Sequence, residues 1–361
     1  MKIGFDAKRY LNNTTGLGNY SRELVHAYAK SFPDDELFLI SGNPKDADRI
    51  HEIKNISFVA PKKKTRLFRA WYCYKLINDL GLDIYHGLSN EIPFSHKKIK
   101  AKLVCTIHDV IFKYYPNYYK WWDRYIYHRK TRNAMLFSDL IITTSDTTGK
   151  DLIKFYPKSG IPSSTIYQSI NQAYRLNVPK MEFSERHHFV YVSSFTQRKN
   201  HATLIEAFNL IKNQTKKNLL LIGQSGSELE SIKRLIASYH LDDRIKIHIN
   251  AKTSFIKESI RDATAFIYPS FYEGFGIPLI ESAFLETAIA ASDIGIFNEL
   301  SKESIIYFHP NKPEEIADAM LRLEDKEVNY EQTQKLNLLR ELSDPLKASH
   351  SLRTKYQGLI K

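Results

Sequence analysis

The chain has 361 residues, of which 43% are hydrophobic and 25% charged, a balance typical of a folded globular protein rather than a disordered one. Its formal charge of +12 comes from 52 Lys and Arg against 40 Asp and Glu, and it contains only 2 Cys. This composition argues against a disulfide-stabilised secreted scaffold, and no apolar run approaches the ~20 residues of a bilayer-spanning helix.

In chain order, the first half alternates short apolar runs with amphipathic stretches. This order predicts a parallel sheet covered by helices, with ligands at the C-terminal ends of the strands. Strands are predicted at 2–5, 36–40, 83–85, 102–107 and 140–143, and helices at 19–32, 68–80 and 146–156.

A polar connector around 171–180 separates this half from a second alternating series. There, strands are predicted at 188–192, 218–222, 245–249 and 265–268, and helices at 202–212, 228–239, 255–262 and 276–285. We therefore expect an α/β protein in which two Rossmann-like domains, 1–175 and 185–340, face each other across a cleft. A last helix within 344–361 is expected to pack back onto the first domain.

The positive charge is confined to the first half. Residues 1–180 contain 29 Lys and Arg against 16 Asp and Glu, whereas residues 181–361 contain 23 against 24. Two segments of this half, 61–72 and 112–130, interleave cations with aromatic residues. Such segments suit an anionic membrane surface or nucleic acid, and a solvated basic face over packed rings is an equally good interpretation. The candidate binding residues of these segments are Lys62, Lys63, Lys64, Arg66, Trp71, Trp121 and Trp122.

Two adjacent cations, Arg198 and Lys199, follow the first strand of the second domain and precede a helix. Cations in this position can neutralise a diphosphate at the helix N-terminus. A surface Arg-Lys pair is the commoner explanation when nothing else accompanies it.

The accompanying segment is 269–281, a loop that leads into a helix. Gly274 and Gly276 flank Phe275 there and let backbone N–H groups approach a ligand closely. Glu273 lies at the start of the loop, and Glu281 lies two helical turns into the helix, so their carboxylates can accept hydrogen bonds from two different sugars. The Glu-x7-Glu spacing is weak on its own and specific when joined to this loop.

Segments 193–200 and 269–293 together resemble the retaining glycosyltransferases of family 4, and the chain is similar to mannosyltransferase-like group 1 glycosyltransferases, which have the GT-B fold. Phe5-Asp6-Ala7, the segment 16–24 and Thr106-Ile107-His108-Asp109 resemble parts of their first domain, in the right order. The resemblance extends from Met1 to about Leu300.

This resemblance implies transfer of a hexose from a nucleotide-diphosphate sugar, held by the second domain, with retention of anomeric configuration. Arg198 and Lys199 would hold the diphosphate and stabilise the leaving group. Glu281 would bind the ribose, and Glu273 would bind the donor sugar together with the backbone of Gly274, Phe275 and Gly276. From the first domain, which would bind the acceptor, His108 would contact the sugar and the loop Gly16-Leu17-Gly18 would close over phosphate. The candidates for contact with the membrane or the acceptor are Lys62, Lys63, Lys64, Arg66, Trp71, Trp121 and Trp122.

No metal or cofactor is expected, because cations already in place can stabilise the charge that builds on the diphosphate. We expect GDP-mannose or a UDP-sugar as donor and a lipid-linked glycan of surface polysaccharide synthesis as acceptor. The expected location is the cytoplasmic, inner face of the cell membrane, bound through the basic first domain, and no nucleic acid partner is expected. Two alternatives stay open: a nucleotide-sugar epimerase of the same fold, and a non-catalytic basic protein that binds membrane or nucleic acid.

Three departures from the family pattern affect the donor side. Ser193 and Ser194 stand where a Gly is usual, which predicts a missing phosphate contact. Glu286-Thr287-Ala288 replaces Gly-Thr-Pro, and Ala348-Ser349-His350 occupies the place of a Trp in the last helix. These departures put donor geometry in question more than the reaction class.

Overall fold

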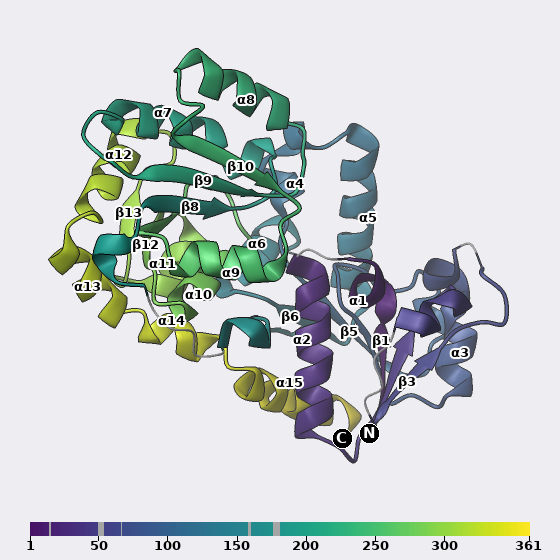
Figure 1. Ribbon diagram of the computed structural model, residues 1–361. Coiled ribbons are helices and arrows are strands. Elements are labelled where there is room, and N and C mark those ends of the chain that lie inside the picture. The colour runs from purple at the N-terminus through teal and green to yellow at the C-terminus, as the bar shows by residue number, and fades with distance from the viewer. Residues whose placement is uncertain (14–15, 50–53, 66, 158–159, 176–180) are drawn as a thin grey trace. The chain divides into compact units, whose positions relative to one another are not determined.

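The computed structural model describes residues 1–13, 16–49, 54–65, 67–157, 160–175 and 181–361 (Figure 1). The chain divides into two compact units. The first consists of Met1–Ile170 together with Ser343–Lys361, and the second of Asn171–Leu342. The connector residues 171–175 therefore belong to the second unit, and the last helix belongs to the first.

The first unit is a parallel sheet with helices on it (Figure 1). In the described residues the sheet has seven strands, in the order β3-β2-β1-β4-β5-β6-β7. The strands are β1 (Lys2–Asp6), β2 (Glu36–Ile40), β3 (Ile56–Val59), β4 (Ile84–Gly87), β5 (Lys102–Ile107), β6 (Leu140–Thr143) and β7 (Ser163–Thr165). The helices are α1 (Ala7–Asn12), α2 (Gly16–Ser31), α3 (Cys73–Asp79), α4 (Ile111–Tyr114), α5 (Trp121–Phe137), α6 (Asp146–Phe155) and α15 (Pro345–Ile360), with a π-helical turn, η2, at Phe68–Tyr72.

Local sequence explains where several of these elements lie. All four residues of β4 and of β6 are buried, as expected of parallel strands that are covered on both faces. Side-chain oxygens cap helices at their N-termini: Asp6 accepts from the backbone N–H of Lys8 at α1, and Ser145 accepts from that of Thr148 at α6.

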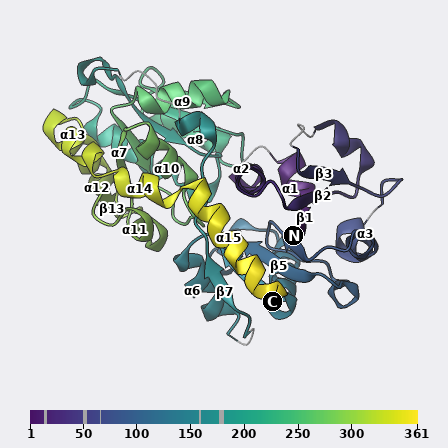
Figure 2. The same cartoon turned by 90° about the horizontal axis from the view of Figure 1, so that it is seen from below.

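Helix α15 completes the core of the first unit by packing on α2 (Figure 2). Its Leu352 and Tyr356 are fully buried, and the Tyr356 hydroxyl lies 2.6 Å from Nδ1 of His86 on β4. Nε2 of His86 lies 2.8 Å from Oγ1 of Thr106 on β5. Helix α15 is thus linked to β4 through Tyr356 and, by way of His86, to β5.

The second unit is a parallel sheet of six strands in the described residues, in the order β10-β9-β8-β11-β12-β13. The strands are β8 (His188–Val192), β9 (Asn218–Gly223), β10 (Ile245–Ile249), β11 (Ala265–Tyr268), β12 (Ala288–Ser292) and β13 (Ile306–Phe308). The helices are α7 (His201–Ile211), α8 (Leu229–Ser238), α9 (Thr253–Arg261), α10 (Ile277–Phe284), α11 (Gly295–Ser301), α12 (Pro313–Arg322), α13 (Lys326–Gln334) and α14 (Asn337–Leu342).

Both sheets have the strand order of a Rossmann fold, which confirms the predicted pair of parallel-sheet α/β units. In each sheet the order reverses beside the first strand, between β1 and β4 in one unit and between β8 and β11 in the other. Ligands of open α/β sheets bind at the carboxyl ends of the strands that flank such a reversal. Each unit therefore has one favoured ligand site. Within the described ranges, no helix has the length and apolarity needed to cross a membrane.

Candidate active site

The candidate site lies at the strand reversal of the second unit, where the loops after β8 and β11 meet. The loop after β8 contains a 3-10 turn, η7 (Gln197–Lys199). A backbone hydrogen bond joins the two loops: the N–H of Phe271 donates to the carbonyl of Arg198 over 3.0 Å. The buried Tyr191 hydroxyl adds a bond to the carbonyl of Lys199 over 2.8 Å. The position of the Arg-Lys pair is thus fixed by the sheet beneath it.

Arg198 and Lys199 both bind Glu273. Nη1 of Arg198 lies 3.2 Å from Oε2 of Glu273, and Nζ of Lys199 donates to Oε1 of the same carboxylate. Burial by itself would raise the pKa of Glu273, but attraction by Lys199 and Arg198 outweighs it and lowers the pKa to about 2. The three side chains predicted from two distant motifs therefore form one cluster that is charged at neutral pH.

Asn200 is a residue of this site that the sequence reading did not single out. It has a left-handed backbone (φ 56°) and directly precedes α7. Its Nδ2 donates to the carbonyls of Pro269 and Pro310, so it joins the loops after β8, β11 and β13. The available signal was an Asn immediately before a helix, since Asn tolerates this conformation better than most residues.

Gly276 directly precedes α10, and Glu281 lies within that helix. Gly276 has φ 105°, and a Cβ on it would lie 2.8 Å from Cε1 of Phe297, so only glycine fits this turn. Glu281 is buried, and its carboxyl has no hydrogen-bond partner among the described residues. Burial raises its pKa to about 8, so it is mostly neutral at pH 7. A carboxyl in this state is ready for hydroxyl partners that the protein does not supply.

Two of the departures from the family pattern have local structural explanations. Oγ of Ser193 lies 3.2 Å from Nε2 of His201, whose buried ring stacks on Phe195. Burial, together with the charge of Lys199, lowers the pKa of His201 to about 3. Glu286 has a left-handed backbone with φ 55°, the conformation that glycine adopts most easily, and its carboxylate pairs with Arg340 at 3.4 Å.

In the first unit, His108 follows β5 and is buried with both ring nitrogens engaged. Nε2 lies 2.9 Å from the carbonyl of Leu88 and therefore carries the proton, while Nδ1 lies 2.9 Å from Nε2 of Gln168 and accepts. Burial lowers its pKa to about 4, so the ring is neutral at pH 7. Its predicted contact with the donor sugar stays a prediction.

The segment Gly16-Leu17-Gly18, expected as a loop, is instead the first turn of α2. Gly18 is required there because a Cβ on it would lie 1.7 Å from the carbonyl oxygen of Asn13. The helix therefore starts three residues before its predicted position. Glycine, which has no Cβ, allows its first turn to lie against the backbone of Asn13. A closure of this segment over phosphate stays a prediction.

The predicted membrane and acceptor residues are exposed wherever the structure describes them. Lys62, Lys63 and Lys64 lie between β3 and η2, and Arg66 is outside the described residues. Trp71 is on η2, whereas Trp121 and Trp122 begin α5. The structure therefore distributes these residues over more than one element.

Comparison with known proteins matches both halves of the chain. The family model for glycosyl transferases group 1 matches residues 177–337, and that for Glycosyltransferase Family 4 matches residues 14–174. The chain is 26% identical over 349 residues to O-antigen chain mannosyltransferase B of Escherichia coli, covering 89% of this chain and 90% of that protein. It is 25% identical over 274 residues to O-antigen chain mannosyltransferase RfbU of Salmonella typhimurium, covering 74% and 75%. Among solved structures, sucrose-phosphate synthase from Thermosynechococcus elongatus has the same fold, with a TM-score of 0.77 over 99% of both chains at 18% identity.

Proposed function

This chain belongs to the group 1 and family 4 glycosyltransferases, and we propose that it transfers a mannosyl residue from GDP-mannose to an acceptor glycan in surface polysaccharide synthesis, with retention of configuration. The cluster of Arg198, Lys199 and Glu273 at the strand reversal carries this proposal. Mannose as the transferred sugar is supported by the two mannosyltransferases to which the chain is similar along most of its length.

In the proposed reaction, the bond between C1 of mannose and the diphosphate oxygen breaks, and the acceptor hydroxyl forms a bond to C1 from the same face. Its proton passes to the departing diphosphate. The negative charge that builds on that oxygen is stabilised by Arg198 and Lys199. Glu273 holds both cations in place beforehand, so the site needs little rearrangement when the donor binds.

Glu281 is proposed to bind the nucleoside of the donor. Its carboxyl is buried on α10 and lacks a hydrogen-bond partner in the part of the chain that the structure describes. Ribose hydroxyls would provide that partner and would favour the ionised carboxylate, which accepts from both. We propose that the transfer requires no metal, with the two cations in the role that a divalent ion has in other transferases.

The acceptor is proposed to be lipid-linked, with the first unit docked on the inner face of the membrane. The support is electrostatic: the excess of Lys and Arg lies in the first half, where exposed Trp71, Trp121 and Trp122 also lie. Cations attract anionic headgroups, and Trp rings partition to the depth of those headgroups.

The deciding experiment measures nucleoside diphosphate released from GDP-, UDP- and dTDP-sugars, with a detergent-solubilised lipid extract as acceptor. We expect release that needs both GDP-mannose and the lipid and that persists with EDTA present. NMR of the anomeric proton of the product reports retention. A donor that changes its sugar without transfer would instead indicate an epimerase, and silence with every donor, without a thermal shift by any nucleotide, would favour a non-catalytic binding protein.

A further inference from the structure

A network of polar side chains inside the second unit ends on the backbone of the Arg198–Lys199 turn. It begins at His201, the first residue of α7, and passes through Ser193 and Tyr191 to the carbonyl of Lys199. His201 and Tyr191 are buried, and Ser193 is half-buried. All of these residues belong to β8, to the loop after it or to the start of α7. One short segment therefore supplies both the cations and the side chains that contact their backbone.

The backbone of Ser193 has little freedom to move. Its N–H donates to the carbonyl of Ile222 over 2.9 Å. A Cβ on Gly223 would lie 1.7 Å from the carbonyl oxygen of Ser193, so the end of β9 lies directly against this residue. Only glycine permits an approach this close. The Ser193 hydroxyl therefore extends from a fixed position toward a fixed set of partners.

The direction of the hydrogen bonds follows from the Tyr191 end of the network. The Tyr191 hydroxyl donates its only proton to the carbonyl of Lys199 over 2.8 Å, so its oxygen can only accept from Ser193. A bond from Ser193 does act on this phenol: burial raises the pKa of Tyr191, and the Ser193 bond lowers it. Ser193 thereby uses its own proton. Its Oγ must then accept from Nε2 of His201, which lies 3.2 Å away.

His201 accordingly carries its proton on Nε2. Its Nδ1 is buried and has no hydrogen-bond partner in the part of the chain that the structure describes, and a bare nitrogen tolerates this better than an N–H group. Burial and the charge of Lys199 keep the ring neutral at pH 7. The ring stacks on Phe195 with centroids 4.6 Å apart and lies 4.8 Å from the ring of Tyr191. These contacts fix the plane in which Nε2 donates.

We propose that His201 and Ser193 are positioning residues for the sugar transfer and act on the catalytic cation Lys199. They orient the Tyr191 hydroxyl, which holds the backbone of Lys199, and so keep the ammonium in place as charge builds on the diphosphate. This inference rests on the proposed function and adds two residues to the same site. Ser193 stands where the family usually has glycine, which has no hydroxyl to link the other two side chains. The network is therefore a feature of this sequence.

The first test compares substitutions of His201 in the full chain, with release of GDP from GDP-mannose as the assay. His201→Phe keeps a flat ring against Phe195 but removes the donor, so kcat should fall about tenfold while the KM for GDP-mannose stays nearly unchanged. His201→Gln places an amide N–H near the position of Nε2 and should restore most of kcat, whereas the shorter His201→Asn should not. A packing role alone would instead favour Phe over both amides, and that order would overturn the inference.

The matched control is His188→Phe. His188 is a half-buried histidine at the start of the same strand, and its Nε2 donates to the carbonyl of Ser259 over 2.8 Å, away from the site. This variant also loses one imidazole donor and should retain the wild-type kcat.

Ser193→Ala tests the other member of the pair. It should lower kcat about as much as His201→Phe, and the double variant should lose no more than either single variant because the network is broken only once. Losses that multiply would show two independent residues and would contradict the proposal. Ser231→Ala on α8, which loses a hydroxyl bond of 2.8 Å to the carbonyl of Glu228, is the control for this substitution.

The position of Lys199 is measured without any donor. In the full chain labelled with ¹⁵N-lysine, the ammonium signal of Lys199 is protected from exchange by Glu273, and Lys199→Arg assigns it. We expect His201→Phe and Ser193→Ala to move this signal, His201→Gln to return it toward its wild-type position, and His188→Phe to leave it in place. A signal that His201→Phe leaves unmoved overturns the inference whatever the turnover, as does a moved signal with unchanged kcat. The expected shifts in a protein that releases no GDP would refute only the proposed donor.

Discussion

Lys199 is the residue on which the proposed chemistry depends most. It is a nearly buried cation that binds Glu273, and it lies 5.7 Å from the ring centroid of Tyr268. We expect Lys199→Ala to lower kcat by about 10²–10³, the range seen when one donor to a developing oxyanion is removed. The exposed Lys216→Ala, in the same unit, should retain wild-type turnover in the GDP-release assay. Normal turnover in Lys199→Ala would refute the assignment of the site.

Glu281 makes the second unit less stable than it could be. Its folded pKa of about 8 lies above the ordinary glutamate pKa of 4.5, so the folded state keeps a proton that the unfolded state loses. Stability is therefore unaffected below pH 4.5 and falls as pH rises from 4.5 to 8, by up to about 5 kcal/mol. Glu281→Gln removes this loss.

We thus expect Glu281→Gln to raise the melting temperature at pH 8, to have little effect at pH 4.5, and to weaken GDP binding. Calorimetry of both proteins across this pH range, with GDP titrations at pH 7, checks both expectations. Equal melting curves at pH 8 would show that the Glu281 carboxyl already has a partner in solution.

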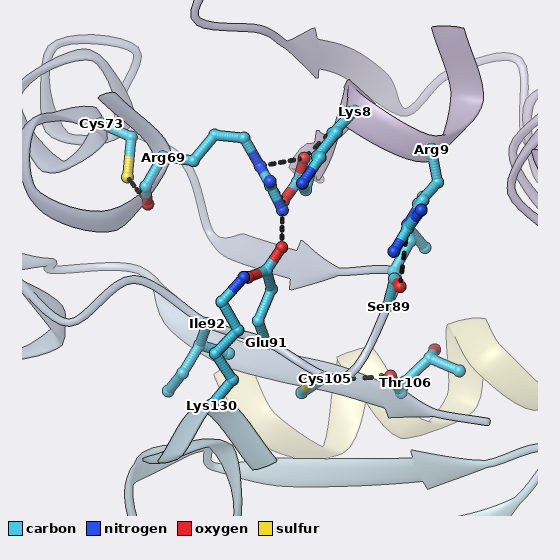
Figure 3. A network of polar contacts seen from close by, with 12 residues as sticks. Lys8, Arg9, Arg69, Cys73, Ser89, Glu91, Ile92, Cys105, Thr106 and Lys130 are labelled. Atoms are coloured by element: carbon cyan, nitrogen blue, oxygen red, sulfur yellow. Dashed lines mark hydrogen bonds and ion pairs between the residues drawn. The ribbon is translucent and has the colours of Figure 1, made fainter. Parts of the chain in front are cut away.

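Sequence motifs identified some of the charged residues that the fold brings together. Arg198, Lys199 and Glu273 were named from the sequence because the types and order of residues around them are specific. The ion pair of Arg69 with Glu91 (Figure 3) was not, because only the fold brings together two positions that are far apart in the chain. A charge pair between distant positions leaves no periodic trace in a sequence.

At the scale of single elements, helix α5 shows why periodicity can fail. Its buried residues include Thr131 and Asn133, while Trp121, Trp122 and Tyr125 are exposed. This reverses the usual apolar-inside pattern, so the segment read as a basic aromatic patch and not as a helix. Strand β12 was missed for another reason: its sequence Ala-Ile-Ala-Ala-Ser is rich in alanine, which favours helices, and burial between two strands overrides that preference.

The exposed Trp residues of α5 yield a prediction for membrane binding. We expect the double change Trp121→Ser and Trp122→Ser to weaken binding to vesicles rich in phosphatidylglycerol about tenfold or more, because two interfacial rings are lost. Tyr330→Ser, an exposed ring of similar size on α13 of the second unit, is the control. Co-sedimentation with vesicles, at low and at physiological salt, measures the binding of the double variant and of the control. Unchanged vesicle binding would mean that the protein docks on membranes through another surface or does not dock on them.

At the scale of the molecule, the first unit should be sensitive to mild acid. Burial lowers the pKa of His86 to about 3 and that of His108 to about 4, so neither ring takes up a proton in the folded state near pH 5. The unfolded chain does so below pH 6.5, and stability therefore falls as pH decreases from 6.5 to 4. The two imidazoles together lower the free energy of unfolding by about 3 kcal/mol per pH unit.

All three Trp lie in the first unit, so tryptophan fluorescence follows the unfolding of that unit alone. We expect its urea midpoint to be clearly lower at pH 5 than at pH 7. Identical midpoints at the two pH values would mean that these imidazoles reach solvent or protonate within the fold.

The second unit is inserted into the first: the chain leaves the first unit at Ile170 and returns to it at Ser343. During synthesis, the ribosome therefore releases the whole second unit before it releases α15. At about 5–20 residues per second, the first unit waits roughly 10–35 s for its last helix. Throughout that interval the apolar face of α2 that Leu352 and Tyr356 will cover, including Tyr28, stays open to chaperones and to other nascent chains. The continuous second unit can close its own core in the meantime, so the half that was started first is finished last.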